Sequence, residues 1–232
     1  MRIMFAGPSG IGKTTLAEWL PTILNDTNSP TMFISGSVSD LIPSTKDVSH
    51  TDMLNRDPKA LYKEDYQILN LRNKKYQNLE DFVTDRSYLD SAAYFTYKQA
   101  DKIPACELEH FINLCSMLLV KQCDILVVLE LGYENIGKWV TEDNNKRITS
   151  NYFQNTISQI MINNLYYMGY QPTRYYTYIP NGLFHKCMDL DKPVETGIIS
   201  NPYGVTKVLR IPELNLEKRK LILEKFVCKK NW

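Results

Sequence analysis

The sequence predicts an α/β fold in which a doubly wound parallel sheet of five strands carries helices on both faces. Three observations predict this fold. Short apolar segments typical of strands alternate along the chain with segments of helical periodicity. Residues 124–131 are almost entirely apolar, as expected of a strand that helices cover on both sides. Residues 2–14 are typical of a strand that leads through a glycine-rich loop into a helix.

The N-terminal half supplies three of the predicted strands. They are the short apolar segments 2–6, 31–34 and 82–84. Helices are predicted where apolar residues recur with helical spacing, from residue 15 onward, over 60–76 and over 88–99. Residues 39–58 are rich in Ser, Thr, Asp and Pro, which predicts a long loop on the substrate side of the sheet.

The C-terminal half continues the alternation as far as residue 179. A helix that Pro104 can start is predicted over 106–120, the central strand over 124–131, a helix over 151–168 and the fifth strand over 175–179. Residues 182–212 show no clean period, and 214–227 predict an amphipathic helix. We therefore expect a core over 1–180 with a lid at 132–150, and an extension over 181–232 packed on the core.

Composition excludes several classes of protein. With 232 residues, 44% of them hydrophobic, 23% charged and a formal net charge of +1, the chain is typical of soluble globular proteins. No apolar run approaches about 18 residues, so we expect no membrane partner and a cytoplasmic protein. The five cysteines form no C-x-x-C pair and the three histidines, including His50 in the long loop, are scattered, which disfavours a zinc site.

The segment 7–14 fills the pattern G-x-x-x-x-G-K-[ST]. Its glycines let the backbone fold around an anion, so that successive N–H groups point at phosphates. Lys13 would reach the β- and γ-phosphates of ATP, and the Thr14 hydroxyl would hold Mg²⁺. A chance glycine-rich turn is disfavoured by the flanking strand and helix. The residues expected to bind the nucleotide are Gly7, Ser9, Gly10, Ile11, Gly12, Lys13, Thr14 and Thr15.

Asp85 and Arg86 directly follow the third strand. The carboxyl ends of parallel strands open onto one ligand crevice, so we expect both side chains to face the same site as Lys13. Asp85 could accept the proton of an attacking hydroxyl or hold Mg²⁺ through water, and the sequence leaves both roles open. Arg86 would clamp a phosphate or fix the acceptor. The structural alternative is a surface ion pair at a helix N-terminus.

Further candidate residues lie at the fourth strand and in the lid. Glu130 ends the apolar segment and could be a second acidic ligand for Mg²⁺, in competition with Asp85, or a merely solvated charge. Arg147 is expected to fold over the γ-phosphate as part of a lid, and Lys138 and Lys146 are weaker candidates of the same kind. A solvated loop is the alternative for all three.

Candidate substrate contacts are Gln67, Arg72 and Ser37. The carboxamide of Gln67 offers one donor and one acceptor, which matches a pyrimidine edge, although an exposed helical glutamine is the plainer interpretation. The predicted C-terminal helix carries Lys218, Arg219 and Lys220. It either caps the sheet as a solvated helix or contacts a DNA backbone.

With the phosphate loop, Asp85-Arg86-Ser87 and the polar segment around Arg147 in this order, residues 1–180 resemble P-loop kinases of the nucleoside and nucleotide type. The resemblance implies ATP and Mg²⁺ as cofactors, Asp85 as the acid that activates the acceptor hydroxyl, Arg86 as its phosphate-side partner and Arg147 as the lid arginine. The chain departs from the family in a lid with one clear arginine and in the C-terminal extension.

Residues 33–40 together with 82–94 look similar to bacteriophage kinases, some of which act on deoxynucleosides and others on 5-hydroxymethyluracil in DNA. The resemblance implies transfer of the ATP γ-phosphate to a pyrimidine nucleotide component. The most specific form of this expectation is the 5-hydroxymethyl group in phage DNA, in the host cytoplasm. A kinase for a free deoxynucleoside or its monophosphate and a nucleotide-hydrolysing switch are the alternatives, and the oligomeric state is left open.

Overall fold

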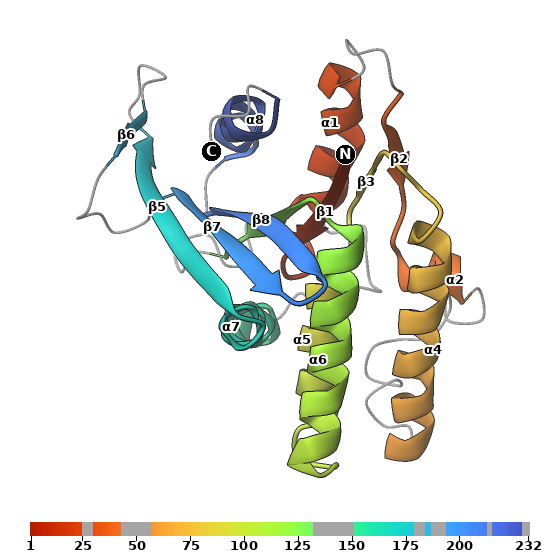
Figure 1. Cartoon of the computed structure of the whole chain (residues 1–232). Coiled ribbons are helices and arrows are strands. Elements are labelled where there is room, and N and C mark those ends of the chain that lie inside the picture. The colour runs from red at the N-terminus through yellow and green to blue at the C-terminus, as the bar shows by residue number, and fades with distance from the viewer. Residues whose placement is uncertain are drawn as a thin grey trace.

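The computed structural model describes residues 1–24, 30–42, 57–131, 151–178, 184–186, 194–212 and 215–228. Their strands form one sheet in the order β2-β3-β1-β4-β8-β7-β5-β6, with helices on both faces (Figure 1). The strands are β1 (Arg2–Ala6), β2 (Met32–Ile34), β3 (Phe82–Thr84), β4 (Ile125–Leu129), β5 (Tyr170–Tyr178), β6 (Phe184–Lys186), β7 (Val194–Asn201) and β8 (Gly204–Ile211).

The helices agree closely with the predicted ones. They are α1 (Lys13–Leu24), α2 (Val38–Leu41), α4 (Pro58–Tyr76), α5 (Tyr88–Gln99), α6 (Ala105–Gln122), α7 (Asn151–Tyr167), α8 (Leu216–Leu223) and a π-helical turn, η3 (Glu224–Cys228). Side chains cap the starts of α4 and α5. Asp57 accepts from the Lys59 backbone N–H at the start of α4, and Ser87 forms a capping box with Asp90 at the start of α5. Short α2 was not predicted.

The sheet confirms the predicted parallel arrangement but differs in size and in its fifth strand. Strands β2, β3, β1, β4 and β8 are parallel, whereas β7, β5 and β6 extend the sheet through antiparallel pairs. Of the predicted fifth strand, 175–179, residues 175–178 belong to β5, and both β8 and β7 lie between β5 and β4. β8 takes the place beside β4 instead, from the pair Ile125↔Lys207 to the pair Leu129↔Ile211.

The prediction of five strands was wrong because β7 and β8 bury polar residues. Glu195, Thr196 and Thr206 all lie in the interior, where they break the apolar pattern expected of core strands. Each has a hydrogen-bond partner; the Thr206 hydroxyl, for example, donates to the Cys123 carbonyl at 2.7 Å. The expected boundary between core and extension, near residue 180, therefore falls between strands of one sheet. The division into a core and an extension stays a prediction.

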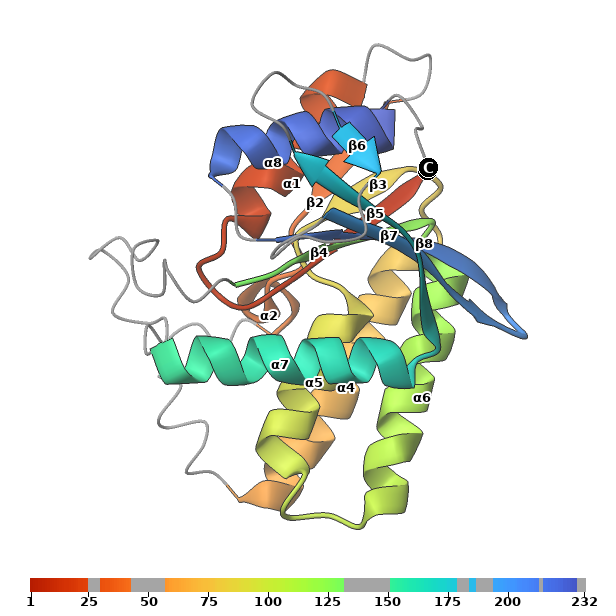
Figure 2. The ribbon, with the colours of Figure 1, turned by 90° about the vertical axis from the view of Figure 1, so that its left-hand side faces the viewer.

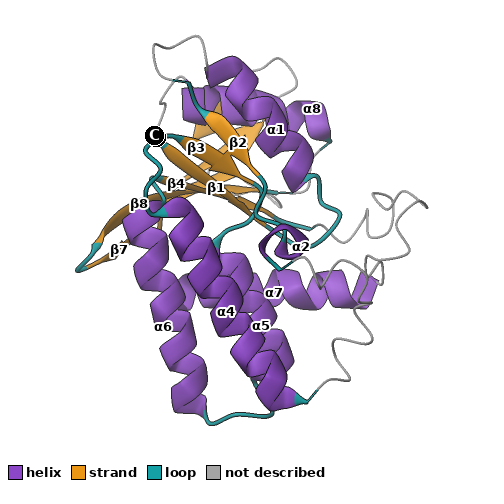
Figure 3. Cartoon of the chain, turned by 90° about the vertical axis from the view of Figure 1, so that its right-hand side faces the viewer, coloured by secondary structure: helices purple, strands orange, loops and turns teal. Residues whose placement is uncertain are grey.

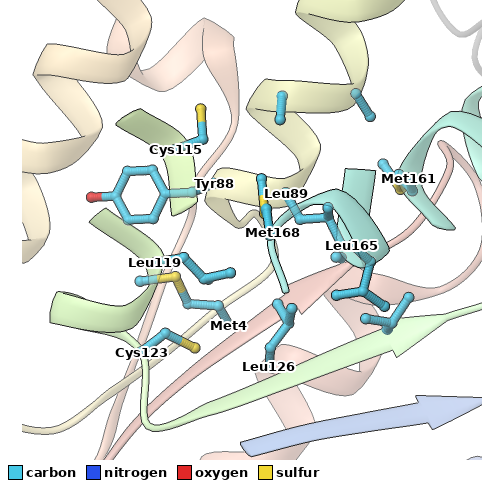
Figure 4. Packing of buried hydrophobic residues seen from close by; sticks show 14 of the residues in the cluster. Met4, Tyr88, Leu89, Cys115, Leu119, Cys123, Leu126, Met161, Leu165 and Met168 are labelled. Atoms are coloured by element: carbon cyan, nitrogen blue, oxygen red, sulfur yellow. The ribbon is translucent and has the colours of Figure 1, made fainter. Parts of the chain in front are cut away.

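Two layers of helices cover the sheet. Helices α1 and α8 lie on one face and α4, α5, α6 and α7 on the other (Figures 2 and 3). Side chains of β1 alternate between the layers, with Ile3 on the α1 side and Met4 on the other. Figure 4 shows Met4 in the hydrophobic core on the side of α4 to α7. Its neighbours there include Tyr88 of α5, Leu119 of α6 and Leu165 of α7. The apolar faces of both helix layers thus meet a sheet that is buried on both sides.

Some predicted features lie outside the described residues. These are His50 with most of the long loop, and the lid 132–150 with Lys138, Lys146 and Arg147. Across the described ranges, no helix is both long and apolar enough to cross a membrane.

The position of β8 in the sheet generates a stability prediction. Leu209 is fully buried under α1 and α8, so Leu209→Ala should lower the free energy of unfolding by about 2–5 kcal/mol. Urea denaturation followed by circular dichroism measures this change. The control is Lys207→Ala on the same strand, whose side chain is exposed and whose loss should change stability little. Equal stability of both variants would contradict a core position for β8.

Candidate active site

The phosphate loop runs from the end of β1 to the start of α1 and depends on its glycines. Gly10 and Gly12 have positive φ angles of 80° and 89°, which favour glycine. A side chain on Gly7 would lie 2.7 Å from the Leu129 carbonyl oxygen, so the loop leaves β1 pressed against the end of β4. The sequence pattern and the backbone therefore agree that this loop can close around an anion.

Lys13 lies over the loop rather than in solvent. Its side chain is buried, and Nζ donates to the carbonyl oxygens of Gly7 at 2.6 Å and Pro8 at 2.7 Å. The ammonium group is therefore held at the centre of the loop. If the Lys13 ammonium group moved from these carbonyls to a phosphate, it would exchange neutral acceptors for anionic ones, which form stronger hydrogen bonds.

Asp85 joins three separate segments at the carboxyl edge of the sheet. It follows β3 and is buried, with Oδ2 accepting from Thr14 Oγ1 at 2.7 Å and Oδ1 accepting from the Gly36 backbone N–H at 2.8 Å. The structure thus brings Asp85 to the phosphate loop, as the sequence predicts. Thr14 itself is exposed, so its hydroxyl lies at the open side of the site.

The loop after β2 is held in place from α4. Arg72 is buried and donates from Nη2 to the Gly36 carbonyl at 3.0 Å, and from Nη1 to the Ser87 carbonyl and the Ser91 hydroxyl. Lys75 donates to the Ser35 carbonyl at 2.8 Å. Arg72 was predicted to contact the substrate, but the groups that it contacts here belong to the protein. It orients the loop whose N–H binds Asp85.

The other two predicted substrate residues lie in different surroundings. Ser37 directly follows Gly36 and is half-buried, with its hydroxyl 2.7 Å from that of Ser39. It therefore lies beside the Asp85 site. Gln67 is exposed on α4, five residues before Arg72, and its contact with a base stays a prediction.

Arg86 is held at the start of α5. Its Nη1 lies 3.3 Å from Asp90 Oδ1, and its guanidinium carbon lies 5.8 Å from the centre of the Tyr94 ring. Burial alone would lower the pKa of Arg86, but Tyr94, Asp90 and Asp85 raise it above its ordinary value. The side chain is therefore a fixed positive charge beside Asp85, suited to bind an oxyanion.

Glu130, the predicted second metal ligand, belongs to a different cluster. Its carboxylate accepts from Arg210 Nε at 2.6 Å, and Arg210 also binds Glu195, which accepts from the Tyr170 hydroxyl. Burial would lower the pKa of Arg210, but the two carboxylates raise it above its ordinary value. Among the described residues no group of three His, Cys, Asp or Glu side chains is placed to hold a metal. Beside the phosphate loop, the Thr14 hydroxyl and the Asp85 carboxylate bring two side-chain oxygens within 2.7 Å of each other.

Two contacts with the phosphate loop were not predicted. Gln154 of α7 donates to the Ser9 carbonyl at 2.8 Å, and Arg219 of α8 donates to the Ile11 carbonyl at 2.6 Å. Arg219 was predicted as a possible DNA contact, which is wrong because the side chain is buried. One signal in the sequence could have shown this. Arg219 lies three and four residues before the buried Ile222 and Leu223, and hence on the inner face of the helix.

Comparisons with known proteins identify the fold. No family model matches the chain, and no curated protein is similar to it in sequence. Twenty-four chains of solved structures have a similar fold. One is described as deoxyadenosine kinase from M. mycoides with products dCMP and a flexible dCDP bound. It has a TM-score of 0.50 and 15% identity, over 72% of this chain and 84% of that chain. The predicted α/β fold, with helices on both faces of a central parallel sheet, is therefore confirmed, and it is similar to the fold of this kinase.

Gly36 provides a test of the geometry around Asp85. A Cβ atom there would lie 2.5 Å from the Arg86 Cβ and 2.8 Å from the Tyr76 hydroxyl, so Gly36→Ala must displace the loop. We expect a loss of about 1–3 kcal/mol in the free energy of unfolding, measured by urea denaturation. Ser39→Ala, three residues further along the same chain, is the control and should change stability by less than about 0.5 kcal/mol. A Gly36→Ala protein as stable as the control would contradict this packing.

Proposed function

We propose that this chain is an ATP-dependent kinase that transfers the γ-phosphate to a hydroxyl of a free deoxynucleoside or deoxynucleoside monophosphate. The observation that carries the proposal is the hydrogen bond between Thr14 of the phosphate loop and Asp85, which directly follows β3. This contact supports the proposal because the loop would bind the transferring phosphate and the adjacent carboxylate could act on an acceptor hydroxyl. Phosphoryl transfer requires mainly such positioning and charge neutralisation.

The loop and Lys13 would bind the triphosphate. Backbone N–H groups at the start of α1 would surround the β- and γ-phosphates, and Lys13 would leave the Gly7 and Pro8 carbonyls to contact them. Arg86 would neutralise charge on the acceptor side. Arg147 of the lid is proposed for the same task from above, on the resemblance in sequence alone.

The oxygens of Thr14 and Asp85 fit a magnesium ion. Mg²⁺ favours oxygen ligands, and in kinases one or two protein oxygens complete a shell of phosphates and water. When bound, the ion would neutralise charge on the β- and γ-phosphates. Thr14 would bind it directly and Asp85 through water or as the acceptor of the substrate proton, both roles being compatible with the present position of its carboxylate.

A free nucleoside or nucleotide fits the structure better than DNA as the acceptor. The case for 5-hydroxymethyluracil in DNA rested on the basic C-terminal helix, but its cations Arg219 and Lys220 have partners inside the protein. Arg219 is buried, and Lys220 pairs with Glu217 at 3.0 Å and lies 5.6 Å from the centre of the Trp19 ring. The neighbour in fold is described as a deoxyadenosine kinase with products dCMP and dCDP, which are free nucleotides.

The acceptor can be tested directly. ATP labelled at the γ-phosphate is offered together with each deoxynucleoside, each deoxynucleoside monophosphate, and duplex DNA with and without 5-hydroxymethyluracil. We expect label on at least one free nucleoside or monophosphate and none on DNA. Label on the modified DNA alone would replace this proposal with the DNA-acting one, and release of free phosphate without any labelled acceptor would favour a nucleotide hydrolase.

Asp85 is the residue whose loss should separate binding from transfer. Asp85→Asn retains the shape but removes the negative charge and the proton acceptor, so transfer should fall about a hundredfold or more while ATP still binds. Steady-state kinetics and calorimetric titration with ATP measure the two effects. Asp101→Asn, which changes an exposed aspartate in the turn after α5, is the matched control. Normal turnover in folded Asp85→Asn would contradict both roles proposed for Asp85.

A further inference from the structure

Side chains bind four carbonyl groups of the phosphate loop. Lys13 binds the carbonyls of Gly7 and Pro8, Gln154 that of Ser9 and Arg219 that of Ile11. Gln154 comes from α7 and Arg219 from α8, and both side chains are almost fully buried. The loop is thus fixed from both helix layers of the protein and not only by its own sequence.

The geometry of the peptide bond gives these contacts a function. In a trans peptide the C=O of one residue and the N–H of the next point in opposite directions, and the described chain contains no cis peptide. Holding the Ser9 carbonyl therefore turns the Gly10 N–H to the opposite side. Holding the Ile11 carbonyl does the same for the Gly12 N–H. These N–H groups are the donors that the loop would present to a triphosphate.

Arg219 also connects the loop with the end of β4. Its Nη1 binds the Ile11 carbonyl at 2.6 Å, and its Nη2 lies 3.4 Å from the Glu130 carbonyl oxygen. A hydrogen bond from a cation to a carbonyl is stronger than a neutral one and polarises the peptide, which makes the N–H on the other side a better donor. Arg219 can therefore both orient and strengthen the donor at Gly12.

We propose that Arg219 and Gln154 are positioning residues that preorganise the phosphate loop for a nucleoside triphosphate. The C-terminal helix is thereby part of the nucleotide site, although it contributes no group that touches the nucleotide. This inference rests on the proposed function only in requiring that the loop binds a triphosphate. It does not depend on which acceptor is phosphorylated.

The test compares binding with stability. Arg219→Met and Gln154→Leu, each with the rest of the chain intact, are titrated calorimetrically with Mg²⁺ and a non-hydrolysable ATP analogue. We expect each variant to bind about tenfold or more weakly than the unmodified protein, because each removes a hydrogen bond that orients a donor. Arg219→Lys, which retains a cation, should recover part of the affinity. Lys220→Met on the same helix also removes one positive charge and should bind normally.

Kinetics separate positioning from a merely structural role. Both variants should raise the KM for ATP and leave the KM for the acceptor unchanged, whereas a loss of folded protein would lower kcat alone. The proposal would be overturned if the Arg219→Met or the Gln154→Leu protein had a lower melting temperature but bound the ATP analogue as tightly as the unmodified protein. If Arg219→Met does not fold, Gln154→Leu and Arg219→Lys decide. If the unmodified protein binds the analogue but phosphorylates no acceptor, the proposed kinase function fails while the binding test still stands.

Discussion

The parallel pairing of β1 with β3 and β4 is the constraint on which the candidate site depends. Its register sets Met4 beside Thr84 and beside Leu126, so all three strands end at the same edge. One residue after Thr84 comes Asp85, and the loop that starts at Gly7 lies next to it. The Thr14 hydroxyl can then reach the carboxylate without any distortion of the strands. A shift of the register by one residue would turn every side chain of β3 to the opposite face and remove this contact.

Most of the site could be predicted from the sequence because its chemistry imposes local patterns. A backbone that closes around phosphate needs glycines at fixed spacing, so the segment 7–14 is recognisable without a structure. Asp85 was found by a rule of similar generality, since polar residues that follow a buried strand lie at the ligand edge of a parallel sheet. The helices were predicted with ends near the observed ones because their apolar periodicity and caps are local as well.

The rest could not be predicted because it depends on contacts between distant segments. Gln154 and Ser9 are 145 residues apart, and Arg219 and Ile11 are 208 residues apart. A hydrogen bond between residues so far apart produces no repeating pattern of apolar residues in the sequence around either partner. The antiparallel pair β7 and β8, which brings β8 beside β4, was missed for a related reason. Burial of Glu195 is compensated by Arg210 and Tyr170, partners on two other strands, so the sequence of β7 by itself does not show that it is a core strand.

The late position of β8 and α8 in the chain has a consequence for how the protein acquires its nucleotide site during translation. β4 can gain its neighbour on the β8 side only after residue 211 has left the ribosome, and the Ile11 carbonyl can meet Arg219 only after that. Because loops must close over long stretches before these contacts form, such topologies fold slowly. The phosphate-binding sequence is therefore made well before its surroundings are complete, because Arg219 is translated 208 residues after Ile11.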